Sequence, residues 1–224
     1  MSINPPKILF EDPHLVVLDK PAGLLSQGEH TGDENLVDWL RGHFGRHYVG
    51  LVHRLDRNTS GLMVVAKRTK SAQRLTEALL QNRIRREYLA WLRGRLSGTA
   101  RWEHRLEKDI ERNLVRVTNS GGQPSALRVT PIEVIRNPLD PSTELTLARF
   151  CLETGRSHQI RVQAAAEKHP LLGDVKYGPR LPSPITRPAL HSARLEFPHP
   201  MSGEVMVYEL DLPADMASVR RTVR

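Results

Sequence analysis

The sequence predicts an α+β fold, built on a mixed, mostly antiparallel β-sheet with flanking helices. Two observations support this prediction, and a third shows that the chain is globular. Segments with the two-residue alternation or the short apolar runs of strands outnumber segments with helical periodicity. The strand-like segments do not alternate regularly with helices, as they would in a parallel α/β sheet. Hydrophobic residues make up 39% of the 224 residues, which is enough to form a buried core.

The first part of the chain is expected to combine short strands with two helices. The expected strands cover residues 8–12, 14–20, 61–67 and 86–96, with a short extended stretch at 50–54. The expected helices cover residues 33–45 and 69–82. Asp33 and Thr69 are the candidate caps, because short polar side chains accept hydrogen bonds from the first free N–H groups of a helix. Gly45 is expected to end the first helix, since glycine adopts the left-handed conformation common at that place.

The remainder is expected to be rich in antiparallel strands. These cover residues 101–109, 113–118, 126–135 and 144–154 and are followed by a helix within 155–169. The proline-rich segment 178–188 is expected to be a surface loop, and residues 193–200 and 203–213 a closing hairpin. Residues 1–213 are therefore predicted to form one domain. The basic segment 214–224 is predicted to be a mobile tail.

The charge of the chain indicates a polyanionic partner. Lysine and arginine number 33 against 25 aspartates and glutamates, which gives a formal net charge of +8. Nucleic acid is the most common partner of such a protein, and the basic residues gather within 53–70 and 83–95. The alternative is a surplus of surface charge that serves only solubility.

The sequence shows no pattern typical of secretion or membrane insertion. No apolar stretch approaches the ~20 residues that a spanning helix needs, and no signal-peptide pattern is present near the N-terminus. Cys151 is the single cysteine, so no disulfide can form within the chain. A reducing, cytoplasmic location is therefore expected. A monomer is the default expectation for the oligomeric state.

The segment HRLDRNTSGLMVVAK, residues 53–67, contains the strongest candidate for chemistry. Asp56 lies in an expected turn directly before a strand, between Arg54 and Arg57. An aspartate at such a place can simply cap the turn. Nearby guanidinium groups, however, favour the ionised carboxylate, and a positioned carboxylate can act as a nucleophile or as a proton acceptor.

A second candidate lies in the segment LETGRSHQIR, residues 152–161. Arg156 follows a glycine turn at the start of an expected helix. Its charge, the free N–H groups of the first turn and the helix dipole all favour an anion at this place. The alternative is a solvated arginine that binds no ligand.

These segments belong to a longer resemblance that spans roughly residues 8–213. The chain contains, in order, LVVLDKPAGL, HRLDRNTSGLMVVAK, REYLAWLRG, LETGRSHQIRVQ, HPLLGDVKYG and LHSARLEFPHP. This series resembles the RluA-type pseudouridine synthases, enzymes that isomerise uridine to pseudouridine in RNA. The resemblance implies the pseudouridine synthase fold with a central RNA-binding cleft. It also implies RNA as the partner, ribosomal or transfer RNA, and no metal or organic cofactor.

The resemblance implies a role for particular residues. Asp56 corresponds to the catalytic aspartate, Tyr88 to an active-site tyrosine that packs against the uracil, and Arg156 to an arginine that pairs with the aspartate. Arg54 corresponds to an arginine that displaces the target base from its stack. Further RNA contacts are expected from the same motifs, at His53, Arg57, Thr59, Lys67 and Arg161. The strand pattern alone favours a core position for Tyr88.

The sequence also departs from the family pattern. The family often has Gly-Lys-x-Ala-x-Thr in the middle of the chain, whereas this chain has GGQPSALRVTP, in which Ala126 fits but the threonine does not. About seven residues precede the first motif, so a catalytic domain without an S4 domain is expected. Two alternatives remain open, a non-catalytic RNA-binding or ribosome-assembly protein and a hydrolase of glycosidic bonds. Whether Asp56 adds to the nucleotide or removes a sugar proton is also open.

Overall fold

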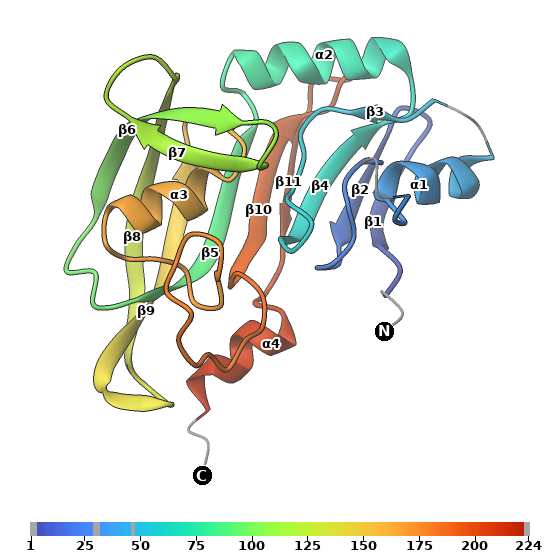
Figure 1. Ribbon diagram of the computed structural model, residues 1–224. Helices are drawn as coiled ribbons and strands as arrows, with labels where there is room; N and C mark the ends of the chain where they lie inside the picture. Colours follow the sequence, from blue (N-terminus) through green and yellow to red (C-terminus); the bar gives the residue numbers. More distant parts are fainter. Residues whose placement is uncertain (1–3, 29–31, 46–47, 222–224) are drawn as a thin grey trace. The chain divides into compact units, whose positions relative to one another are not determined.

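The computed structural model describes residues 4–28, 32–45 and 48–221. Within these ranges the chain forms eleven β-strands, four α-helices and one short 3₁₀ helix (Figure 1). The predicted α+β class is therefore confirmed. The chain groups into two compact units, where the sequence predicted one domain. The first unit contains residues 1–86 and 192–211, and the second contains residues 87–191 and 212–224.

The sheet of the first unit combines strands from the N-terminal part of the chain with two strands from near its C-terminal end. Its strands lie in the order β1 (Lys7–Glu11), β2 (Leu15–Lys20), β4 (Ser60–Ala66) and β10 (Leu190–Pro198), with β3 (Gly50–Leu51) paired to β4 and β11 (Val205–Glu209) paired to β10. The β1–β2, β2–β4, β3–β4 and β10–β11 pairings are antiparallel. All seven residues of β4 are buried, as expected for the continuous apolar run that the sequence shows there.

Two helices belong to the first unit, α1 (Leu36–Phe44) and α2 (Thr69–Leu80). The apolar side of α2 packs on β2, β4 and β10 through one buried cluster that includes Leu75, Ala78, Val64 and Phe197. Gly45 ends α1 at φ 61°, as predicted. Both predicted caps are wrong. The side chain of Asn35, not Asp33, accepts from the Asp38 N–H at 3.1 Å, whereas α2 starts without a side-chain cap after Arg68.

The second unit contains a sheet of long antiparallel strands. Their order is β5 (Arg85–Arg93), β9 (Asp140–Leu152), β8 (Gln123–Asn137), β6 (Ala100–Asp109) and β7 (Leu114–Thr118). Each neighbouring pair is antiparallel. Helix α3 (Gln159–Ala166) lies against β6 and β7. The proline-rich segment 178–188 forms no helix or strand, as predicted. No helix in the described part of the chain is long and apolar enough to cross a bilayer.

Residues 214–220 form helical turns where the sequence predicted a mobile tail. These are α4 (Ala214–Ala217) and a 3₁₀ turn (Ser218–Arg220). Met216 and Val219 are fully buried in a cluster with Trp91 of β5, and the Trp91 indole Nε1 donates to the Met216 carbonyl oxygen at 2.9 Å. This packing argues against the predicted mobility of these residues, because two apolar side chains three positions apart anchor an otherwise basic segment. Residues 222–224 lie outside the described ranges.

Candidate active site

Asp56 lies in a loop of the first unit, between β3 and β4. Its carbonyl oxygen accepts a hydrogen bond from Thr59 N–H at 3.0 Å, which closes the predicted turn. The Asp56 residue is half-buried, whereas Arg54 and Arg57 on either side are exposed. Arg57 pairs with Asp33 at 2.8 Å. The carboxylate is thus carried on a turn with two guanidinium groups in the adjoining sequence.

The end of β2 and the segment that follows it anchor this loop. Gly23 N–H donates to the Arg57 carbonyl oxygen at 2.8 Å, and Lys20 Nζ donates to the same oxygen at 3.2 Å. Lys20 also donates to the carbonyl oxygens of Pro21 and Leu24, at 2.9 and 2.7 Å. Lys20 is fully buried, so these three carbonyl oxygens accept the hydrogen bonds that its ammonium group would otherwise donate to water.

The loop enters β4 at a glycine that the packing requires. Gly61 has φ +111°, and a Cβ atom added to it would lie 2.2 Å from the carbonyl oxygen of Ser192 in β10. Any other residue would collide with this backbone. Thr59 and Ser60 are buried beside it. Burial argues against the predicted RNA contact of Thr59, whose side chain faces the interior of the protein.

His53 links the loop to β4 from inside the unit. Its Nε2 accepts a hydrogen bond from Val64 N–H at 3.2 Å, and the residue is buried. Burial, together with the positive charge of Arg86, lowers the pKa of His53 to about 3. The imidazole is therefore neutral at physiological pH and faces the strand, which argues against its predicted role in binding RNA.

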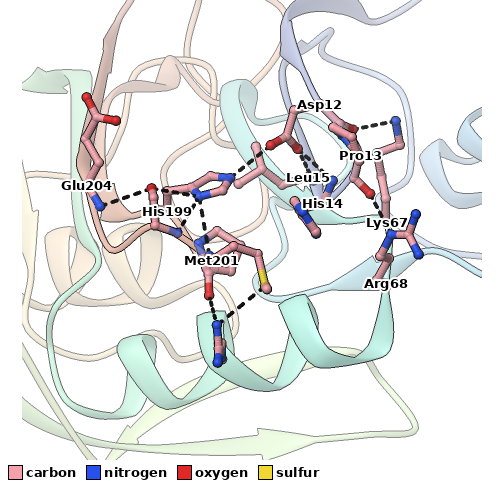
Figure 2. A network of polar contacts seen from close by, with 12 residues as sticks. Asp12, Pro13, His14, Leu15, Lys67, Arg68, His199, Met201 and Glu204 are labelled. Carbon is pink, nitrogen blue, oxygen red and sulfur yellow. Dashed lines mark hydrogen bonds and ion pairs between the residues drawn. The ribbon is translucent and has the colours of Figure 1, made fainter.

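Lys67 belongs to a polar network at the other end of β4 (Figure 2). Its Nζ donates to the carbonyl oxygen of Asp12 at 2.7 Å and pairs with Glu11. The Asp12 carboxylate in turn accepts from His14 N–H and Leu15 N–H, both at 2.7 Å. Its second oxygen lies 2.9 Å from His199 Nε2, in the turn between β10 and β11. Since Lys67 is buried within this network, the predicted RNA contact is not supported.

Arg156 lies in the loop of the second unit that precedes α3. The Gln159 side chain organises this loop, because its Oε1 accepts from Arg156 N–H at 3.0 Å and from the Thr154 hydroxyl at 2.8 Å. Its Nε2 donates to the Ala126 carbonyl oxygen of β8 at 3.0 Å. The side chain of Arg156 is exposed, with Nε 3.3 Å from the Pro124 carbonyl oxygen. The arginine is thus presented to solvent from an anchored main chain.

Arg161 faces the interior from α3. It forms an ion pair with Asp174, with Nε 2.7 Å from one carboxylate oxygen and Nη2 2.9 Å from the other. Its guanidinium also lies 5.0 Å from the ring centre of Tyr177. The predicted RNA contact of Arg161 is therefore not supported. Most residues of α3 are buried, so a charged residue on this helix need not face solvent.

Tyr88 is buried on β5, opposite Phe150 of β9, as the alternating pattern predicted. Tyr88 and Arg156 belong to the second unit and Asp56 to the first, so the joint arrangement of these three residues remains a prediction. In the described ranges, no group of three or more His, Cys, Asp or Glu side chains is arranged to hold a metal ion.

Sequence reasoning did not single out the residues that anchor the two loops. They are Lys20, Ser26 and Gln159. A weak signal was present, because each is a polar residue inside or beside an apolar motif. Polar residues at such positions need hydrogen-bond partners when they are buried, but the sequence does not say which backbone groups these partners are.

Comparisons with known proteins agree on one family. A family profile described as RNA pseudouridylate synthase matches residues 14–166. Ribosomal large subunit pseudouridine synthase D of Nitrosomonas europaea is 38% identical over 237 residues, which cover 98% of this chain and 66% of the relative. The protein of the same name from Vibrio vulnificus is 34% identical, with coverage of 98% and 71%. The chain thus spans about two thirds of the length of these curated relatives.

Solved structures support the fold. Human RNA pseudouridylate synthase domain containing 1 superposes with a TM-score of 0.76, covering 94% of this chain and 85% of that chain. Human RNA pseudouridylate synthase domain containing 4 gives a TM-score of 0.73 and covers 95% and 91%. The sequence identities are 23% and 20%, so these similarities concern the fold alone.

Proposed function

Because this chain belongs to the RNA pseudouridylate synthase family, a family of isomerases, we propose that it converts uridines of large-subunit ribosomal RNA to pseudouridine with Asp56 as the catalytic carboxylate. The family and enzyme class predicted from the sequence are thereby confirmed. The substrate and the catalytic residues are the proposed part. The curated relatives are named for the large ribosomal subunit, which favours ribosomal over transfer RNA.

The observation that carries the catalytic assignment is the environment of Asp56. The residue is half-buried on a turn whose main chain is hydrogen-bonded on both sides. It lies between two exposed arginines, Arg54 and Arg57. A carboxylate on a half-buried residue with a fixed backbone suits a group that must meet a substrate atom, since catalysis depends on a well-defined approach.

The proposed reaction needs no group from outside the substrate. The bond between N1 of uracil and C1′ of the ribose breaks, the base turns, and a new bond forms between C5 and C1′. C5 then loses its hydrogen as a proton and N1 gains a proton, so the atoms of the nucleotide are conserved. The target nucleotide must first leave its stack, at a cost of a few kcal/mol. Asp56 either adds to the nucleotide or removes a proton from the sugar. Arg156 is proposed to pair with Asp56. The burial of Tyr88, which is 5% exposed, argues against its predicted packing on the detached base, as it does for the RNA contact of Thr59.

The test uses the purified chain and large-subunit ribosomal RNA that lacks pseudouridine, with transfer RNA as the second substrate. Pseudouridines are mapped by sequencing, and the RNA mass is measured. We expect conversion at specific ribosomal uridines, with no change in mass. Asp56→Asn should lower the rate by about 10²–10⁴-fold while RNA binding changes little.

A matched control separates the Asp56 effect from a general change in charge. Asp38→Asn removes an exposed carboxylate from α1 of the same unit, where it pairs with Arg41. This variant should convert uridine at the wild-type rate. Full activity in Asp56→Asn would remove Asp56 from the mechanism. Release of free uracil with a loss of mass would instead indicate a hydrolase, and binding without conversion by the wild type would indicate a non-catalytic RNA-binding protein.

A further inference from the structure

The residue directly before Asp56 is held by a single side chain. The hydroxyl of Ser26 donates to the carbonyl oxygen of Leu55 at 2.6 Å. The same hydroxyl accepts from Leu55 N–H at 3.1 Å. Both main-chain groups of Leu55 therefore depend on one oxygen atom, which comes from a segment 29 residues earlier in the chain.

The chemistry of a hydroxyl makes this arrangement specific. A serine side chain has one donor hydrogen and two acceptor lone pairs, so it satisfies an N–H and a C=O of the same residue at once. Ser26 is 4% exposed and Leu55 is buried as well. If the hydroxyl is removed, both Leu55 groups are left buried without this partner, and buried polar groups without partners are unfavourable. The loop would then shift to find new partners.

The neighbouring contacts of this loop hold residues other than Leu55. Beyond Asp56, the Arg57 carbonyl oxygen is held by Gly23 N–H, but these groups lie after the carboxylate in the chain. Before Asp56, His53 is held through its ring by Val64 N–H. The Ser26–Leu55 pair thus holds the main chain at the residue from which it enters Asp56.

We propose that Ser26 is a positioning residue, which acts through the main chain of Leu55 to fix the place of the Asp56 carboxylate. The inference rests on the proposed catalytic role of Asp56. A displacement of about 1 Å in a reacting group can lower a rate about 100-fold. A positioning residue should thus change the rate of conversion and leave the binding of RNA almost unaffected.

The experiment compares three substitutions at Ser26. Ser26→Ala removes the hydroxyl, Ser26→Thr keeps it, and Ser26→Val has the shape of threonine without it. The rate is measured in single turnovers with saturating enzyme, at a temperature well below each variant's unfolding midpoint. The Kd for RNA is measured separately. We expect Ser26→Ala and Ser26→Val to be slower by about 10- to 100-fold, with Kd unchanged, and Ser26→Thr to be at least about tenfold faster than Ser26→Val.

Ser192→Ala is the matched control. Ser192 is also buried in the first unit, and its hydroxyl donates to the Leu62 carbonyl oxygen of β4 at 3.1 Å. This substitution removes a buried hydroxyl that holds the strand rather than the loop, so its rate should stay near that of the wild type. Amide hydrogen exchange gives a second measurement. Exchange in residues 53–59 should be faster in Ser26→Ala but not in Ser192→Ala.

The outcomes separate this inference from the proposed function. If Asp56→Asn is inactive but Ser26→Ala keeps the wild-type rate, the positioning role is wrong and the function stands. Equal losses in Ser26→Ala and Ser192→Ala, or equal rates in Ser26→Thr and Ser26→Val, also overturn it. If Asp56→Asn is fully active, the proposed function fails first, and the positioning role fails with it.

Discussion

Arg161 and Asp174 form a buried ion pair in the second unit, joined by hydrogen bonds of 2.7 and 2.9 Å. The side chain of Arg161 is 10% exposed and that of Asp174 is 1% exposed. Because both charges are removed from water, each depends on the other, and loss of one partner leaves an uncompensated charge in the interior.

Asp174→Ala should therefore lower the free energy of unfolding by about 3–5 kcal/mol, measured by urea denaturation. Asp174→Leu combined with Arg161→Met should cost less than Asp174→Ala alone, because no buried charge remains. Glu107→Ala is the control, since it breaks an exposed pair with Arg116 in the same unit and should change the free energy by less than about 1 kcal/mol. A larger loss in the double variant would contradict the explanation.

His53 should make the protein less stable as the pH falls below neutrality. Burial and the charge of Arg86 lower its pKa to about 3 in the folded state, from an ordinary value of 6.5. Between these values the unfolded chain binds a proton that the folded protein does not. The contribution of His53 to the free energy of unfolding is thus unaffected above pH 6.5, and below it this contribution falls by up to about 1.4 kcal/mol per pH unit. His53→Gln should remove the contribution of this one proton from the pH dependence of the free energy of unfolding, measured by urea denaturation from pH 8 to 5. An unchanged slope would contradict the neutral, buried state of His53.

Gln159 should affect the rate only through Arg156. Gln159→Met keeps the size of the side chain but removes the hydrogen bonds that hold Arg156 N–H and the Thr154 hydroxyl. If Arg156 contributes to the reaction, this variant should be slower by about tenfold or more. In an Arg156→Ala background the same change should have little further effect, because residues that act as a unit are not additive. Gln73→Met, on the exposed side of α2, is the control. Losses that simply add would show that Gln159 affects the enzyme by another route.

Met216 should contribute to stability from the end of the chain. It is fully buried against the cluster around Trp91, so Met216→Ala removes apolar contacts and leaves a cavity. The expected loss in free energy of unfolding is about 2–5 kcal/mol. Arg220→Ala breaks only the exposed pair with Glu133 and should cost about 1 kcal/mol or less. Equal stability of Met216→Ala and the wild type would show that the terminal segment is not docked in solution.

Arg54 should matter more for turnover than for initial binding of RNA. It is exposed beside Asp56, where it can take the place of the displaced base. Arg54→Ala should lower the single-turnover rate by a larger factor than it raises Kd.

Binding of RNA should weaken steeply with salt because phosphate contacts release counterions. Lys67→Met should leave the salt dependence unchanged, since Lys67 pairs with Glu11 inside the protein. A reduced salt slope in Lys67→Met would show that this lysine does reach the RNA.

The sequence by itself determined the local structure and the family. The apolar run of β4, the alternation around Tyr88 and the glycine that ends α1 each depend on neighbours in the chain, so their conformations follow from local propensity and pattern. The order of the six motifs carried the family, and Asp56 was placed correctly in a turn before a buried strand.

Only the tertiary structure decided which polar side chains are available to a partner. Lys67 and Arg161 have the same charge in the sequence as Arg54, yet both are buried and paired with carboxylates. Ser26 became significant because folding brings its hydroxyl to Leu55, 29 positions away. Partners so distant in the chain meet only when the sheet has formed, since burial and hydrogen bonding are properties of the packed chain and not of its neighbouring residues.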